Sequence, residues 1–343
     1  MKLFKQILII LIIFFKSGNL LSENNLFNVN NILIDKKDNL TNNQMANKAV
    51  KKAFGQLSKK ILLKKDIQKI SELNYSNIRE LVAYYNISKE SDNDSVVFNV
   101  TFDKDKIHNL FYNKGLLYSD IVDKDFYILP VLLKQNEINI FSNNYFYENW
   151  NNFNKDDLLD FILPLENIET IQNINKFQNN LLDIKLDLVF NELIDKNIAL
   201  VFIENNGQNN EKIYLKAKIQ GKHISKNLVI KKDIKVNNFK DIIISEIKNE
   251  ITNFVKSENL IDIRTPSFIN AKLNLNKKNN LVFFNSKIKN IDLIDNIFVL
   301  EFNKDYVNIK IKYLGKLERM INQLKKENIV IQLVNDEWLI KNL

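Results

Sequence analysis

The side chains that most often carry out chemistry are scarce and scattered in this sequence. The chain has no cysteine and only two histidines, His108 and His223. Catalysis by a cysteine nucleophile is therefore excluded, and a Ser-His-Asp arrangement would have to use one of these two histidines. Neither a Gly-x-Ser-x-Gly elbow nor a His-Glu-x-x-His sequence accompanies them. We expect both histidines to be non-catalytic, and we expect no zinc site.

Nucleotide and cofactor binding are also disfavoured by the spacing of the glycines. Phosphate-cradling loops and dinucleotide fingerprints need several glycines within about eight residues. The six glycines of this chain are dispersed: Gly18, Gly55, Gly115, Gly207, Gly221 and Gly315. The sequence predicts no cofactor.

Acidic residues offer the remaining route to catalysis. Asp156, Asp160 and Glu166 could supply the paired carboxylates of a glycosidase-like hydrolase. Their simpler interpretation is that they face the positive ends of helices, where a negative charge is stabilising. A carboxylate-dependent hydrolase is kept as the alternative function, and the sequence favours a protein that is not an enzyme.

The densest aromatic cluster of the chain is Tyr145-Phe146-Tyr147, followed by Trp150 and Phe153. Alternation would bury Phe146 and expose its two neighbours, so Tyr145, Tyr147 and Trp150 are the candidate partner contacts. The structural alternative is a linker held to its domain by these aromatic rings. Free sheet edges could also receive a strand from a partner, although the sequence does not say which edge is free.

Charge and composition exclude a nucleic-acid-binding protein of the usual kind. The net charge is +8 over 343 residues, and lysines alternate with acids, as in Asp103-Lys104-Asp105-Lys106. A nucleic-acid interface gathers its basic residues on one face instead. Because the chain lacks cysteine, it has no disulfides and depends on its hydrophobic core for stability.

The first residues have the pattern of an export signal. Lys2 and Lys5 precede an apolar run over residues 7–15, which ends at Lys16. The run is about half of the ~20 residues that cross a bilayer, so residues 1–22 are predicted to be a cleaved signal peptide and the mature protein to be periplasmic. If the segment is retained instead, the chain would be a membrane-tethered accessory subunit.

Hydrophobic periodicity predicts an α+β fold of two or three small α/β sandwich modules, over residues 23–153, 154–262 and 263–343. The last module has the order βαββαβ, which is typical of a ferredoxin-like sandwich. The pattern also predicts α-helices over residues 66–81 and 181–195.

Motifs spread along the chain suggest a family. They are Val100-Thr101-Phe102-Asp103, then Leu110, Gly115 and Tyr118, then Ile128-Leu129-Pro130-Val131 with Trp150, an Ala-rich helix from Ala46 to Ala53, the stretch Leu163 to Glu169, and a strand, glycine and helix around Gly315. In these motifs the chain resembles the secreted proteobacterial family catalogued as domain of unknown function 2066. The resemblance implies a cell-envelope location and no established activity. The expected function is a non-catalytic binding or assembly module in the periplasm, with another envelope protein as partner.

Overall fold

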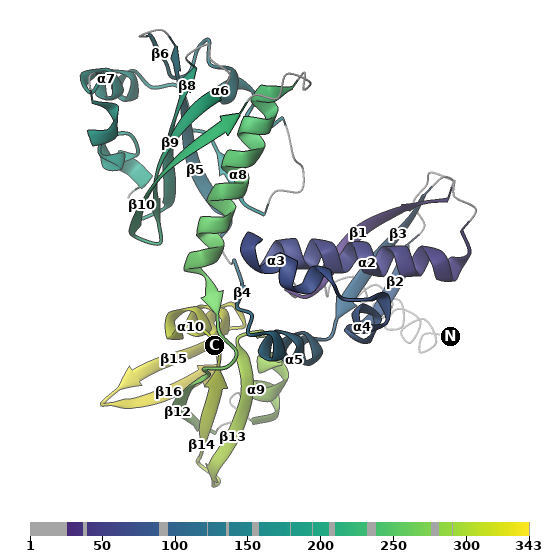
Figure 1. The fold of residues 1–343 in the computed structure, drawn as a ribbon. Helices are drawn as coiled ribbons and strands as arrows, with labels where there is room; N and C mark the ends of the chain where they lie inside the picture. Colours follow the sequence, from purple (N-terminus) through teal and green to yellow (C-terminus); the bar gives the residue numbers. More distant parts are fainter. Residues whose placement is uncertain are drawn as a thin grey trace, which may run out of the picture. The chain divides into compact units, whose positions relative to one another are not determined.

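The computed structural model has a mixed α+β fold, as predicted (Figure 1). It describes residues 26–36, 40–88, 95–121, 123–134, 137–152, 158–178, 180–193, 195–205, 210–231, 238–275, 281–289 and 291–342. The predicted signal peptide, residues 1–22, lies outside this part of the chain. The fold divides into two compact units, and the second of them consists of Lys60–Asp66 and Tyr118–Leu260. The remaining described residues form the first unit.

The first unit begins with an antiparallel sheet covered by a helix. The sheet has the order β1-β3-β2, from β1 (Asn28–Asp35), β2 (Val82–Ser88) and β3 (Ser95–Phe102). The helix α2 (Asn42–Ile61) lies along the sheet (Figure 1). Alternate side chains of β3 face it and are buried: Val96, Phe98, Val100 and Phe102. The period-two pattern thus correctly predicted the core face of β3.

A single helix predicted over residues 66–81 is wrong. The segment forms two shorter helices, α3 (Lys64–Ser71) and α4 (Tyr75–Glu80). The break occurs because Asn74 takes an extended conformation and its side chain accepts a hydrogen bond from the N–H of Asn77 at 3.0 Å. This N-cap starts a new helix instead of continuing the old one. The next helix, α5 (Lys104–Lys114), ends on Gly115 with φ of 61°, the predicted C-cap.

The C-terminal sheet of the first unit has one strand more than the predicted βαββαβ order. Its elements are β12 (Ser267–Asn274), α9 (Leu281–Ile288), β13 (Ile294–Phe302), β14 (Tyr306–Tyr313), α10 (Leu317–Lys326), β15 (Ile329–Val334) and β16 (Glu337–Asn342). The sheet order is β13-β14-β12-β16-β15. Asn335 and Asp336, both with positive φ, form the tight hairpin turn that inserts β16 beside β12 and moves β15 to the edge.

The second unit is built on one large mixed sheet. Its strands are β5 (Asp125–Lys134), β6 (Glu137–Asn139), β7 (Asp160–Ile162), β8 (Asn197–Asn205), β9 (Asn210–Ile219) and β10 (Lys222–Lys231), in the order β10-β9-β8-β5-β6, with β7 also paired to β5. Two short strands, β4 (Tyr118–Ser119) and β11 (Leu260–Ile261), lie near the ends of this segment. Because β5 pairs with β8 in parallel, the domain boundary predicted at residue 153 passes through a single sheet.

Both faces of this sheet are covered. One face packs against α8 (Phe239–Glu258) and the short helix α6 (Tyr145–Asn149), and Figure 1 shows α8 running along the strands. The opposite face packs against α7 (Ile168–Lys176) and a segment of 3-10 turns at Leu181–Asp183, Leu186–Leu188 and Asn191–Leu193. Central strands buried on both faces carry continuous apolar runs, which explains the composition of β5 and β8.

The α-helix predicted over residues 181–195 is therefore wrong, since this segment forms 3-10 turns. Lys216 from β9 donates hydrogen bonds to the carbonyl oxygens of Leu182 and Ile184, at 3.0 and 2.8 Å. In an α-helix these carbonyls would accept from N–H groups four residues further along. The Lys216 side chain, which is distant in sequence, thus occupies carbonyl groups that would accept hydrogen bonds within the predicted helix.

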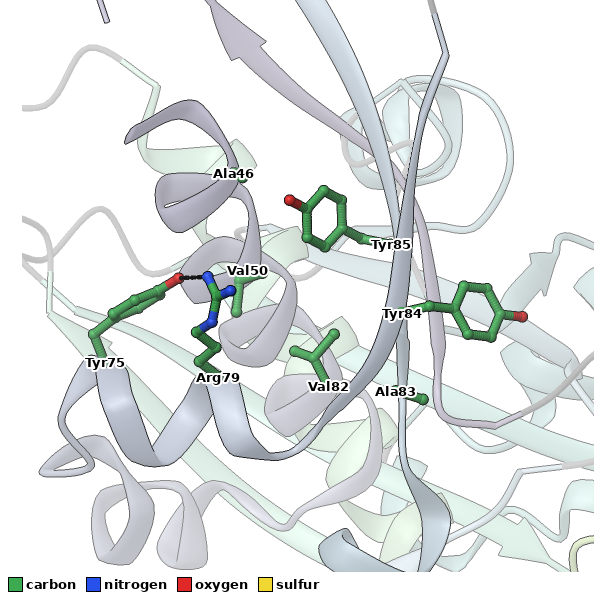
Figure 2. Close-up of a pocket in the computed structure, with 8 residues that line it drawn as sticks. All are labelled: Ala46, Val50, Tyr75, Arg79, Val82, Ala83, Tyr84 and Tyr85. Carbon is green, nitrogen blue, oxygen red and sulfur yellow. Dashed lines mark hydrogen bonds between the residues drawn. The ribbon is translucent and has the colours of Figure 1, made fainter. Parts of the chain in front are cut away.

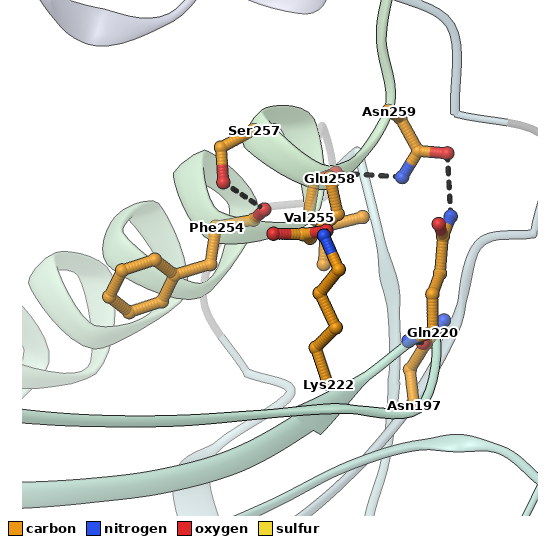
Figure 3. A network of polar contacts seen from close by, with 8 residues as sticks. All are labelled: Asn197, Gln220, Lys222, Phe254, Val255, Ser257, Glu258 and Asn259. Atoms are coloured by element: carbon orange, nitrogen blue, oxygen red, sulfur yellow. Dashed lines mark hydrogen bonds and ion pairs between the residues drawn. The ribbon is translucent and has the colours of Figure 1, made fainter.

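A polar network fastens the end of α8 to the sheet (Figure 3). Gln220 and Gly221, both with positive φ, form the turn between β9 and β10. The Gln220 side chain donates to Asn259 Oδ1 at 2.7 Å, and its backbone N–H donates to Asn197 Oδ1 at 3.0 Å. Lys222 pairs with Glu258 at the same place. The Asn259 amide also donates to the carbonyl oxygen of Val255 at 2.7 Å, which pairs a carbonyl in the last turn of α8, so we assign the network a structural role.

Candidate functional site

A cavity in the first unit lies between two helices and the edge strand of the N-terminal sheet (Figure 2). Its volume is about 340 Å³. Helix α2 supplies small and branched side chains, helix α4 supplies a tyrosine and an arginine, and β2 supplies its first four residues. The lining residues are Ala46, Val50, Tyr75, Arg79, Val82, Ala83, Tyr84 and Tyr85. The lining is mixed: aliphatic side chains come from α2 and β2, and polar groups come from the tyrosines and Arg79.

Arg79 is the only charged residue among those that line the cavity. Its Nη1 donates a hydrogen bond to the Tyr75 hydroxyl at 3.3 Å, and that hydroxyl donates to Asn47 Oδ1 on α2. The hydrogen bond to Tyr75 raises the pKa of Arg79, so the guanidinium stays charged. Lys51 Nζ lies 5.7 Å from the centre of the Tyr75 ring. Arg79 is itself exposed, so the cavity carries one solvent-facing cation, hydrogen-bonded to Tyr75.

The strand β2 that forms one wall is an edge strand. Among the described residues it pairs only with β3. Its apolar and aromatic side chains are unusually exposed: 56% for Tyr84, 38% for Tyr85 and 54% for Ile87. Figure 2 shows Tyr85 on the side of the strand that faces α2, with Tyr84 on the opposite side. An edge strand with exposed apolar groups on both faces can accept another strand, because its outer backbone groups have no partner in the sheet.

A second exposed edge belongs to the C-terminal sheet. There β13 pairs only with β14 among the described strands, and it exposes Phe298, Val299, Leu300 and Phe302. Its pairing is interrupted by register shifts between Ile294 and Asn296 and between Val299 and Glu301, and β2 has one such shift, between Val82 and Tyr84. Bulges of this kind disturb an edge, and β13 carries two of them. The β2 edge also has a cavity with a cationic side chain beside it, and it is the stronger candidate.

Tyr145 and Tyr147, two of the three candidate contacts from the sequence, are held at the surface of the second unit. The Tyr145 hydroxyl donates to Asp241 Oδ1 at 2.6 Å, and this bond raises the pKa of Tyr145. The Tyr147 hydroxyl donates to the carbonyl oxygen of Pro164 at 2.7 Å, and burial raises its pKa. Both side chains are half-buried and partnered within the unit.

Trp150, the third candidate, is fully buried. It lies in the core between α8 and the sheet, with its ring centre 6.2 Å from that of Phe161 in an edge-to-face arrangement. Phe146 is also buried, as predicted, but in a helix instead of an alternating strand. The geometry matches the structural alternative, a segment held to its domain by aromatic rings, and Trp150 has no exposed surface to offer a partner.

Asn144 organises this aromatic segment. Its side-chain amide is buried and donates to the carbonyl oxygens of Pro130, Asn139 and Ile140, at 2.8, 3.1 and 2.8 Å. Its Oδ1 accepts from the N–H groups of the next turn as the N-cap of α6. The side chain therefore joins β5, the end of β6 and the start of α6.

We expect Asn144→Ala to lower the free energy of unfolding by about 2 kcal/mol, because it removes an N-cap and leaves buried carbonyl groups unpaired. Urea unfolding followed by circular dichroism would measure the change. The exposed Asn151 gives the control, since Asn151→Ala should change stability by less than about 0.5 kcal/mol. Equal effects of the two substitutions would contradict the assignment.

In the part of the chain that the structure describes, the candidate carboxylates and the two histidines do not come together as a catalytic site. Asp160 is exposed on β7 and Glu166 is exposed before α7, while Asp156 lies outside the described residues. His108 is buried in α5 of the first unit, and His223 is exposed on β10 of the second. In the described part of the chain, no group of three His, Asp or Glu residues is arranged as metal ligands would be.

Sequence reasoning did not identify the cavity residues Tyr75, Arg79, Tyr84 and Tyr85. One signal was present: the small residues of α2, including Ala46, indicated that something approaches this helix closely. A second was the sequence of residues 82–88, VAYYNIS, which lacks the apolar alternation of residues 95–102. Neither signal shows that α4, α2 and β2 leave a space between them.

Comparisons with family models, curated proteins and solved structures find no match for this chain. Of the helices that the structure describes, none is long and apolar enough to cross a membrane.

Proposed function

We propose that this chain is a non-catalytic binding protein of the bacterial cell envelope, which receives an extended segment of a partner protein as an additional strand on β2. The single observation that carries the proposal is an edge strand, paired only with β3 among the described residues, with exposed Tyr84, Tyr85 and Ile87 beside a cavity of about 340 Å³. Backbone hydrogen bonds along such an edge supply affinity, and a neighbouring pocket supplies specificity.

The envelope location rests on sequence alone. It follows from the predicted signal peptide over residues 1–22 and from the resemblance to domain of unknown function 2066. Because the chain has no cysteine, it cannot form disulfides, and a bacterial periplasm is a more suitable location for it than a disulfide-rich extracellular space. The location and the partner class are parts of the same proposal.

The proposal can be tested with a library of random decapeptides displayed with free carboxyl ends. We expect the purified protein to enrich binders, and we expect Ile87→Lys to weaken the best binder at least tenfold, which corresponds to about 1.4 kcal/mol. The substitution removes exposed apolar surface and places a charge on the edge, and a lysine there disfavours strand addition. Fluorescence anisotropy with the labelled peptide measures the affinity.

The matched control is Val229→Lys, which introduces the same charge on the edge strand β10 of the other unit, where Val229 is 61% exposed. It should leave the affinity within about twofold of the wild type. Failure of the protein to enrich any peptide, or equal loss of affinity in both variants, would overturn the proposal.

A further inference from the structure

We infer that the segment bound at β2 is the carboxyl-terminal end of the partner, running antiparallel to β2, with its terminal carboxylate on Arg79 and its last side chain in the cavity. This inference rests on the proposed function and specifies its ligand. Three features of the first unit carry it: the place of the cavity along β2, the position of α4, and the charge of the lining.

The cavity lies at the beginning of β2. Its lining includes Val82 to Tyr85, the first residues of the strand, whereas Ile87 lies beyond it. A strand added antiparallel to β2 has its own carboxyl end beside Val82. A strand added in parallel would instead begin there. The direction of the added segment therefore decides which chain terminus meets the cavity.

Helix α4 precedes β2 at this end of the edge. It leads directly into β2 through Leu81, and its residues Tyr75 and Arg79 line the cavity together with Val82. An added strand can pair with β2 only as far as Val82, where β2 begins. A segment that ends at the cavity therefore uses the whole edge and has no further residues to accommodate.

The charge of the lining selects the carboxyl end. Arg79 is the only charged lining residue, and its guanidinium is held by Tyr75, which is itself hydrogen-bonded to Asn47. Glu80, the acid next to it in sequence, does not line the cavity. A guanidinium forms strong, often bidentate hydrogen bonds with a carboxylate. The ammonium group of a parallel strand would be repelled, so the electrostatics agree with antiparallel addition.

The rest of the lining suits an apolar last side chain. Ala46 and Val50 from α2 and Val82 from β2 supply aliphatic contacts, and the Tyr85 ring lies on the side of β2 that faces α2. Because the small side chain of Ala46 leaves the space open, a large aliphatic or aromatic residue at the end of the segment can enter it.

The test uses the best decapeptides from the library in three chemical forms. The first has a free carboxyl end, and the second has a carboxamide end. In the third, the last residue is replaced by glutamate and followed by Gly-Ser-amide, so that the only carboxylate at this position is in a side chain. With wild-type protein we expect the free acid to bind at least tenfold more tightly than either other form. In Arg79→Gln we expect the preference for the acid over the amide to fall below about threefold, because the paired cation is gone. Arg79→Lys should retain part of the preference.

Each contrary result has a distinct meaning. If acid and amide bind equally to the wild type while Ile87→Lys still abolishes binding, strand addition stands and the carboxyl-end assignment is overturned. If the glutamate form binds as tightly as the free acid, the site recognises a side-chain carboxylate and the assignment is likewise overturned. If no form depends on Ile87, the proposed function itself fails. Circular dichroism of each variant would exclude unfolding as the cause.

Discussion

Replacement of Trp150 by alanine should lower the free energy of unfolding of the second unit by about 3–5 kcal/mol. The side chain has no exposed surface and packs among Phe161, Phe146 and the side chains of α8 in the core. Its removal leaves a cavity in a region closed by the sheet on one side and a helix on the other, so the surroundings can collapse only partly. Urea unfolding followed by circular dichroism would measure the loss.

Two further substitutions make this test specific. Trp150 Nε1 has no hydrogen-bond partner among the residues that the structure describes, so Trp150→Phe removes no polar contact seen there and should cost less than half as much as the alanine substitution. Trp338, the other tryptophan, is only half-buried on β16, and Trp338→Ala should cost about 1 kcal/mol. A loss below about 1 kcal/mol for Trp150→Ala would contradict a core role and would reopen Trp150 as a contact residue.

Acidification should destabilise the first unit through His108. Burial, together with the charge of Lys104, lowers the pKa of His108 to about 4, and Asp295 partly opposes the shift. The ring is in edge-to-face contact with Phe27, with the two centres 5.6 Å apart. In the unfolded chain the pKa is about 6.5. Between these values the unfolded chain binds more protons than the folded one, so the stability falls as the pH falls from about 6.5 to 4.

The expected loss from this histidine is about 3 kcal/mol at pH 4 relative to pH 7. It is measured as the difference in pH dependence between the wild type and His108→Gln, because acidic residues that titrate in the same range contribute equally to both proteins. His223→Gln, at the exposed histidine of β10, should leave the pH dependence unchanged. Parallel curves for the wild type and His108→Gln would contradict the prediction.

Much of the secondary structure could be predicted from the sequence because it depends on local patterns. The alternation in residues 95–102 predicts a strand with one buried face, and the spacing from Ala46 to Ile61 predicts a helix packed on a sheet. Gly115 ends α5 in the left-handed region, as a glycine after a helix commonly does. Each of these features depends on residues that are close in sequence, and the structure contains the predicted strand, helix and helix end at the predicted positions.

The features that were missed depend on contacts between distant residues. Lys216 takes carbonyl groups from the segment after residue 181 and prevents an α-helix there, and β5 pairs with β8 across the predicted boundary at residue 153. The cavity beside β2 is missed for the same reason, because α2 and α4 are separated by the turn of the chain after Ile61. Composition correctly identified the aromatic cluster as unusual, although Trp150 is a core residue.

Hydrogen exchange tests the central claim most directly. The purified protein is compared with and without the best free-acid decapeptide, and exchange is followed in every region by mass spectrometry. Strand addition predicts slower exchange in residues 82–88, because the outer backbone groups of β2 become hydrogen-bonded, with no change in residues 294–302 of the other exposed edge. Protection confined to any other region, with β2 unchanged, would contradict the account.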